Sequence, residues 1–250
     1  MPKIMGQDAT QTHKTLHGFN FSAVTIDRLG ASDYTLVTIV QDISGSVQGF
    51  AKNMEETLQK ILEACRKSPR SENLLIRLVT FNDHVVEIHG FRELKTIDKA
   101  EYDSILKCYG STALHDASLN SAEATEAYGK QLDDISEIRS NGVMFVITDG
   151  RDNVSVVAKN PEVLKKAFHK IKTGEIALES FLSVLIGVGT DKTEIDFLKD
   201  LKDLAGFDQF VELGDATPSR LAKLADFISR SISSASQSLA SGQVSQPLTF

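Results

Sequence analysis

Short apolar runs alternate along the chain with amphipathic segments, and this alternation predicts its elements. Residues 34–41 (YTLVTIVQ) and 143–148 (VMFVIT) are almost continuously apolar and rich in β-branched side chains, which is typical of strands buried on both faces. Between them, residues 47–67 carry apolar positions three and four apart, the spacing of a helix with one buried stripe. We expect further strands over 74–81, 181–188 and 209–213, and further helices over 98–107, 113–138, 161–169, 193–205 and from Thr217-Pro218 onward.

This order of elements predicts an α/β fold. We expect a doubly wound, mostly parallel central sheet with helices on both faces, because parallel strands need crossover connections and these are nearly always right-handed. Asn82-Asp83 separates two apolar runs, 74–81 and 85–91, and so predicts a β-hairpin. The hairpin would give the sheet one antiparallel edge strand.

The two ends of the chain differ from its middle. Residues 1–32 show no clear periodicity beyond a short strand over 19–24, and we interpret them as an N-terminal extension. Residues 231–250 contain no charged side chain and are rich in Ser, Gln and Ala, a composition that predicts a flexible tail. The chain of 250 residues therefore fits one α/β domain over residues 33–230 with irregular ends.

Composition and charge exclude several classes of function. The net charge of −7 disfavours nucleic acid and anionic membrane surfaces as partners. Two cysteines, Cys65 and Cys108, are too few for a disulfide framework or a cysteine-ligated metal site, which indicates a reducing compartment. No stretch approaches the roughly 20 apolar residues of a membrane-spanning helix, and the N-terminal residues lack a secretory apolar run. We therefore expect a cytoplasmic protein.

Oxygen-bearing side chains gather at the ends of predicted strands, where sheets of this kind bind ligands. Asp42, Ser44 and Ser46 follow the first buried strand, Thr112 precedes the long helix, and Asp149 ends the strand VMFVIT. Alternate residues of an extended turn face the same way, so one loop can offer three ligands. Hard oxygen donors suit Mg²⁺, with Mn²⁺ or Ca²⁺ as alternatives, rather than zinc or copper.

The motif D-I-S-G-S at residues 42–46, followed by Thr112 and Asp149, resembles the D-x-S-x-S … T … D pattern of von Willebrand factor type A (VWA) domains. The order of elements is also similar, over about residues 33–230. The stretches VTIVQDISGSV, CYGSTALHDA and VMFVITDGRDN resemble the intracellular bacterial members, such as tellurium-resistance proteins, more than integrin domains. By family analogy, such members work beside ATPase, kinase or stress-response machinery.

The resemblance implies a Rossmann-like fold and a metal-ion-dependent adhesion site (MIDAS). Ser44 and Ser46 would bind the cation directly, Thr112 directly or through water, and Asp42 and Asp149 would hold coordinated waters. Neutral hydroxyl ligands leave Mg²⁺ electrophilic with one position open, which an Asp or Glu of a partner protein would fill. The resemblance therefore implies a protein-interaction module rather than an enzyme.

Other interpretations of the same residues stay open. A metal-dependent hydrolase or phosphatase could use the ion to activate water, although Ser44 stands where aspartyl-phosphate enzymes need a second carboxylate. A structural subunit could carry a vestigial metal site and make its contacts through the Ser-rich tail. His115, Asp116 and Ser118 suggest a catalytic triad, but they fall in the first turns of a predicted helix. There we expect His115 to be exposed or locally hydrogen-bonded.

Overall fold

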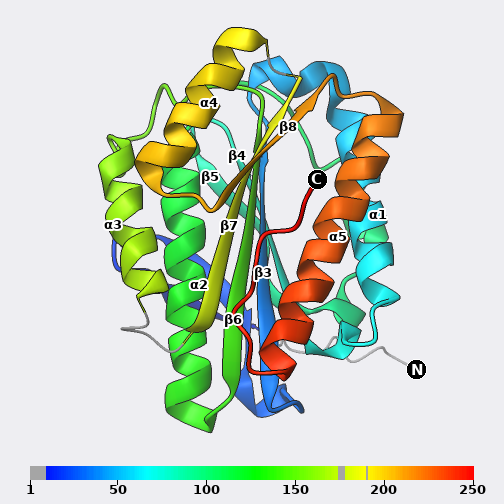
Figure 1. Cartoon of the computed structure of the whole chain (residues 1–250), viewed down its shortest axis with the longest axis vertical. Coiled ribbons are helices and arrows are strands. Elements are labelled where there is room, and N and C mark those ends of the chain that lie inside the picture. The colour runs from blue at the N-terminus through cyan, green and yellow to red at the C-terminus, as the bar shows by residue number, and fades with distance from the viewer. Residues whose placement is uncertain (1–9, 174–177, 190) are drawn as a thin grey trace, which may run out of the picture.

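One sheet organises the part of the chain that the computed structural model describes, residues 10–173, 178–189 and 191–250. Its strands are β1 (Thr10–Lys14), β2 (Asn20–Val24), β3 (Asp33–Asp42), β4 (Leu74–Phe81), β5 (Val85–Glu93), β6 (Arg139–Thr148), β7 (Leu178–Val188) and β8 (Gln209–Gly214). The helices are α1 (Ala51–Arg66), α2 (Leu114–Ser136), α3 (Pro161–Lys172), α4 (Lys192–Ala205) and α5 (Pro218–Ala240). Figure 1 shows α2, α3 and α4 on one face of the sheet and α1 and α5 on the other.

The spatial order of the strands is β1-β2-β5-β4-β3-β6-β7-β8. Strand β3 lies in the middle and pairs in parallel with β4 and β6, and β7 and β8 continue the parallel part. The predicted doubly wound α/β sheet is therefore confirmed. Because β3 and β6 are parallel neighbours, their carboxyl ends open at the same edge of the sheet.

The core lies on both faces of the sheet, which explains why the central strands show no alternation of polarity. All ten residues of β3 are buried. Leu36 and Val40 pack on the side of α2 and α3, whereas Val37 and Ile39 pack on the side of α1 and α5. Successive side chains of a strand point to opposite faces, so a strand covered on both sides reads as one apolar run.

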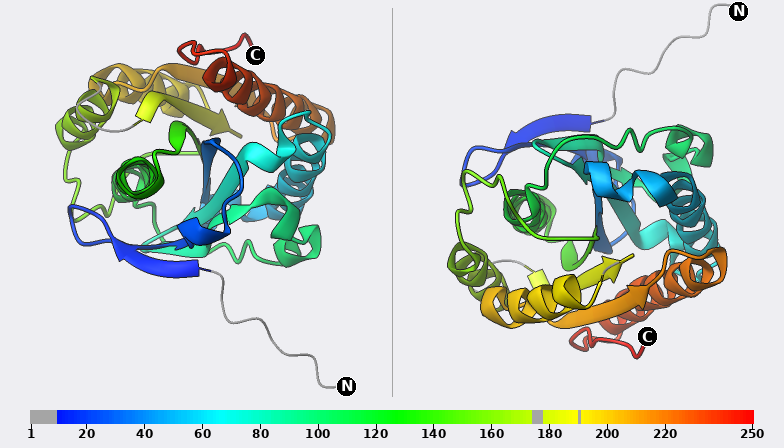
Figure 2. Two further views of the ribbon diagram at one scale, coloured as in Figure 1. Left: turned by 90° about the horizontal axis from the view of Figure 1, so that it is seen from below. Right: turned by 90° about the horizontal axis from the view of Figure 1, so that it is seen from above.

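The hairpin of β4 and β5 is antiparallel, as predicted, but its expected place at the edge of the sheet is wrong. Strand β2 pairs with β5, and β1 pairs antiparallel with β2 to form the edge. Figure 2 looks along the sheet and shows these N-terminal strands beside α2, where Tyr128 donates a hydrogen bond to the carbonyl of Val24 at 2.7 Å. The sequence TQTHK of β1 is polar throughout and none of its residues is buried, so it gives no apolar signal.

The flexible tail expected from residue 231 is wrong for residues 231–240, which form the last turns of α5. Ile232, Ala235 and Leu239 are buried there, at the spacing of one helix face. Beyond the helix, Ser245 accepts a hydrogen bond from Asn141 at 3.0 Å. The serines lower the apolar fraction of this segment, but its apolar residues recur at the spacing of a helix.

Candidate metal centre

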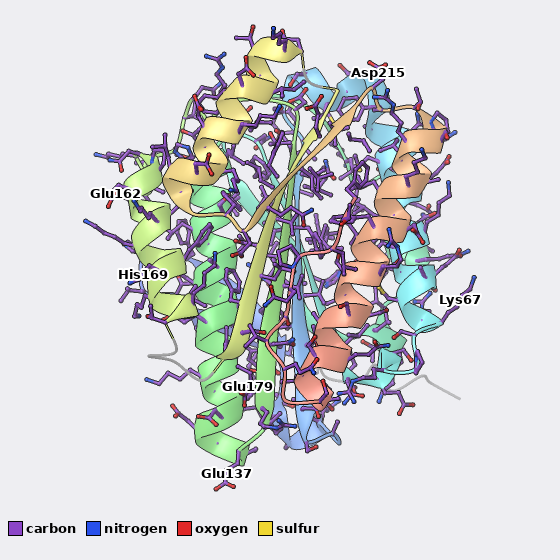
Figure 3. The ribbon with its side chains drawn as sticks, in the orientation of Figure 1. Lys67, Glu137, Glu162, His169, Glu179 and Asp215 are labelled. Carbon is purple, nitrogen blue, oxygen red and sulfur yellow. The ribbon has the colours of Figure 1, made fainter. Side chains whose placement is uncertain are left out.

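The carboxyl end of the sheet brings the loops of the predicted site together. Asp42 is the last residue of β3, and Asp149 directly follows β6. Asp42 is fully buried, whereas Asp149 is half-buried and Ser46 is exposed. In Figure 3 this end of the sheet is the one near the labelled Asp215, opposite the labelled Glu137. The candidate site therefore has a buried floor and a rim open to solvent.

The carboxylate of Asp42 shapes the loop that follows it. Its Oδ1 accepts a hydrogen bond from the backbone N–H of Ser44 at 2.7 Å, which is the hydrogen bond of an Asx turn. Its Oδ2 accepts from the Thr148 hydroxyl at 2.6 Å. The sequence places Thr148 at the end of the strand beside β3, but sequence reasoning gave it no role in the site.

The hydroxyls of Ser44 and Ser46 and the carboxylate of Asp149 lie next to one another beside Asp42. The Ser44 and Ser46 hydroxyl oxygens are 3.1 Å apart, and the Ser46 hydroxyl donates to Asp149 Oδ1 at 2.9 Å. Adjacent ligands of an octahedron with bonds of 2.0–2.1 Å lie about 3 Å apart. The 3.1 Å between the two hydroxyl oxygens therefore fits neighbouring direct ligands of one Mg²⁺ ion, with the Asp149 carboxylate one hydrogen bond away.

Thr112 belongs to the same edge but is held through its backbone. Its N–H donates to Asn153 Oδ1 at 2.8 Å, and its carbonyl accepts from the Asn153 N–H at 3.0 Å. The preceding loop is tied to the first one because Gly45 N–H donates to the Gly110 carbonyl at 3.2 Å. Among the described residues, hydrogen bonds join Asp42, Ser44, Ser46 and Asp149, but none joins the Thr112 hydroxyl to them. Sequence reasoning also missed Asn153.

Gly110 is the residue that lets this second loop turn. Its φ of +78° lies in the left-handed region that a side chain disfavours. A Cβ at this position would also stand 2.4 Å from Asp83 Oδ2. The Asp83 carboxylate in turn accepts a hydrogen bond from the Ser111 N–H at 2.8 Å. This contact from the β4–β5 turn holds the backbone next to Thr112.

Burial perturbs both carboxyl groups of the site. It raises the pKa of Asp42 to about 6, against the lowering effect of the hydrogen bonds from Thr148 and Ser44. Burial also raises the pKa of Asp149, against the hydrogen bond from Ser46. Desolvation disfavours charged carboxylates, and a cation between them would favour their ionised forms.

The donor set agrees with a hard cation. In the ranges that the structure describes, no three His, Cys, Asp or Glu side chains converge as metal ligands. The site instead combines two carboxylates with hydroxyls, the oxygen chemistry of Mg²⁺, Mn²⁺ and Ca²⁺. These residues therefore fit the group that the sequence motif implies.

The suggested triad is not assembled. His115 is buried rather than exposed, with 6% of its surface accessible, and its ring nitrogens make no hydrogen bond among the described residues. The expectation was wrong because the loop after β6 covers the start of α2 and brings Asp152 within 3.6 Å of the imidazole. The Ser118 hydroxyl donates instead to the carbonyl of Leu114, at 2.8 Å.

Fold and site together define an α/β domain with a candidate cation site built from loops at the carboxyl edge of its sheet. The family model of the von Willebrand factor type A domain matches residues 37–206. The chain belongs to this family. A search of curated proteins finds no relative of the sequence.

Solved structures share the fold at low sequence identity. A D319A mutant of the PilB minor pilin from Streptococcus sanguinis is 14% identical, with a TM-score of 0.59 over 90% of this chain and 66% of the pilin. A von Willebrand factor type A protein from Catenulispora acidiphila is 16% identical, with a TM-score of 0.54 over 86% of this chain and 45% of that one. The zinc-occupied form of proximal thread matrix protein 1 from the mussel byssus is 19% identical, with a TM-score of 0.53 over 82% and 46%. This chain thus spans less than two thirds of each of these proteins.

Within the described ranges, no helix is long and apolar enough to cross a bilayer.

Proposed function

We propose that this chain is a metal-dependent protein-interaction module. Asp42, Ser44, Ser46, Thr112 and Asp149 would hold one divalent cation, Mg²⁺ first and Mn²⁺ or Ca²⁺ as alternatives, and the cation would bind an Asp or Glu of a partner protein. The observation that carries the proposal is the 3.1 Å between the Ser44 and Ser46 hydroxyl oxygens, the spacing of neighbouring octahedral ligands, beside the Asp149 carboxylate and above the fully buried carboxylate of Asp42.

The exposure of the site supports recognition of another protein. When bound, the cation supplies an electrophilic centre for an anionic oxygen. Ser46 is exposed and Asp149 is half-buried, so a partner's side chain can reach the rim from solvent. Asp42 lies beneath them and places negative charge under the cation. The cation and the partner's carboxylate would form a desolvated charge pair. Losing this pair would weaken binding of the partner more than losing contacts at the rim of the site.

The alternative of a hydrolase has less support. The carboxylates beside the ion are Asp42 and Asp149, and both accept hydrogen bonds from residues of the site itself. A general base must reach the proton that it removes, and these two are held in other contacts.

The mussel neighbour, described as having a zinc-occupied MIDAS motif, supports cation binding on this fold. The intracellular, tellurium-resistance-like type, the cytoplasmic location and the stress-response setting rest on sequence alone and stay predictions.

The metal claim is tested by calorimetric titration with Mg²⁺ alone. We expect saturable binding by the wild type and an affinity at least about tenfold lower in the double variant Ser44→Ala, Ser46→Ala, because the direct hydroxyl ligands are lost. Saturating Mg²⁺ should raise the unfolding temperature of the wild type but not of this variant.

The matched control is the double variant Ser136→Ala, Ser234→Ala, which removes two hydroxyls from α2 and α5 outside the site. It should respond to Mg²⁺ as the wild type does. Equal Mg²⁺ responses in all three proteins would contradict the proposal. Turnover of a phosphate ester or peptide that is lost in Asp149→Ala would favour the hydrolase instead.

A further inference from the structure

The loop over residues 152–158, here called the clamp loop, lies on the N-terminal turn of α2. The carboxylate of Asp116 accepts hydrogen bonds from three successive backbone N–H groups of this loop. Val156 donates to Oδ2 at 2.9 Å, and Val157 and Ala158 donate to Oδ1 at 3.0 and 2.7 Å. Asp116 is only 8% exposed, so these amides take the place of water around its carboxylate.

The contact is reciprocal, because the clamp loop also satisfies the free N–H groups at the start of α2. The Asp116 N–H donates to Ser155 Oγ at 3.0 Å, and the His115 N–H donates to Asp152 Oδ1 at 3.0 Å. The Ser155 hydroxyl donates to the same Asp152 oxygen. The first amides of a helix need such acceptors from outside the helix, and here one loop supplies them.

Three loops surround the candidate cation: the first follows β3, the second precedes α2, and the third follows β6 and contains the clamp loop. The first loop is joined to the second by Gly45 and Gly110, and to the third by Ser46 and Asp149. The second loop leads through Thr112 into α2, and the clamp loop follows Asp149. The contacts of the clamp loop with α2 therefore join the third loop to the second.

We propose that Asp116 is a positioning residue for the metal site, a role that rests on the proposed function. By holding the clamp loop on α2, it keeps Thr112 and Asp149 within reach of one cation. Hydrogen bonds to a charged acceptor are stronger than neutral ones, and three of them converge here. Without the carboxylate, three amides lose their acceptor, and the clamp loop is held on α2 and Thr112 only by its contacts through Asp152, Asn153 and Ser155.

A purely structural role would make a different prediction. If Asp116 only capped α2, its loss would lower stability and leave the Mg²⁺ affinity of the folded protein unchanged. Partners that orient the ligands of a metal usually change its affinity 10–100-fold when they are removed. Metal affinity and stability must therefore be measured separately.

The matched control is Asp33, another buried carboxylate, at the opposite end of β3. It pairs with Arg70 and accepts a hydrogen bond from Asn73 at 3.2 Å. Asp33→Ala should lower the unfolding temperature, as Asp116→Ala does, because each removes a buried carboxylate that accepts several hydrogen bonds. Only the Asp116 variant changes the site.

The experiment measures the Mg²⁺ affinity of the full chain by calorimetry and the hydrogen exchange of the amides of Val156, Val157 and Ala158. We expect Asp116→Ala to bind Mg²⁺ about 10–100-fold more weakly and to lose protection at these amides. Asp116→Asn, which keeps one acceptor oxygen, should fall between it and the wild type. It also serves as the test if the alanine variant does not fold.

Three results would overturn the inference. In the first, the three amides lose protection while Mg²⁺ affinity stays at the wild-type value. In the second, Asp33→Ala weakens Mg²⁺ binding as much as the Asp116 variants do. In the third, the wild type itself binds no Mg²⁺, which contradicts the proposed function as well and is thereby distinguishable from the other two.

Discussion

Asp42 shows most clearly how burial and charge oppose each other at the site. Burial raises its pKa to about 6, whereas an unfolded aspartate titrates near 4. A carboxyl group whose pKa is higher in the folded state favours folding less and less as the pH rises through that interval. Above about pH 6 the metal-free protein therefore holds a buried charge at a cost, which a bound cation would offset.

The variant Asp42→Asn should remove this pH dependence. In chelator, we expect its free energy of unfolding, relative to the wild type, to increase by about 1–3 kcal/mol between pH 4 and pH 7.5, because the amide does not ionise. Urea denaturation of both proteins at the two pH values measures the difference. A difference that is the same at both pH values would show that Asp42 titrates normally.

At the scale of elements, α5 shows that the period of apolar residues outweighs bulk composition. Its last turns contain many serines and no charge, yet Ile232, Ala235 and Leu239 are buried. Deleting residues 231–250 would therefore remove part of the core. Such a deletion could not test whether the C-terminal segment alone binds a partner.

Replacing Ile232 by Ala tests this role of α5. We expect the free energy of unfolding to fall by about 2–4 kcal/mol, because a fully buried side chain leaves a cavity. Val244→Ala, at a side chain that is 62% exposed, should change it by less than about 0.5 kcal/mol. Equal, small effects in denaturant titrations of both variants would mean that the end of α5 is not packed as described.

The same scale explains which elements the sequence can predict. Strands β3, β4 and β6 are buried on both faces and appear as apolar runs, so their positions and order were predictable. The N-terminal edge was only half predictable: β2 has apolar residues, whereas β1 joins the sheet through backbone pairing. Backbone hydrogen bonds depend little on which side chains a strand carries.

At the scale of the whole molecule, the parallel sheet assembles a site from loops that are far apart in the sequence. The proximity of Asp42, Ser44, Ser46 and Asp149 was predictable because they follow strands whose carboxyl ends meet. The supporting roles of Thr148, Asn153 and Asp116 were not predictable, because these residues act through tertiary contacts that a local sequence pattern does not reveal. The structure also places the start of α2 under the clamp loop, which the helical pattern alone could not indicate.

The most direct test of the account is a crystal structure of the protein grown with Mn²⁺, whose anomalous scattering locates the ion. We predict one strong peak within about 2.0–2.3 Å of the Ser44 and Ser46 hydroxyl oxygens, with Asp42 and Asp149 beside it. The loops folded as described but without a peak between them, or a peak only at carboxylates elsewhere on the surface, would contradict the account.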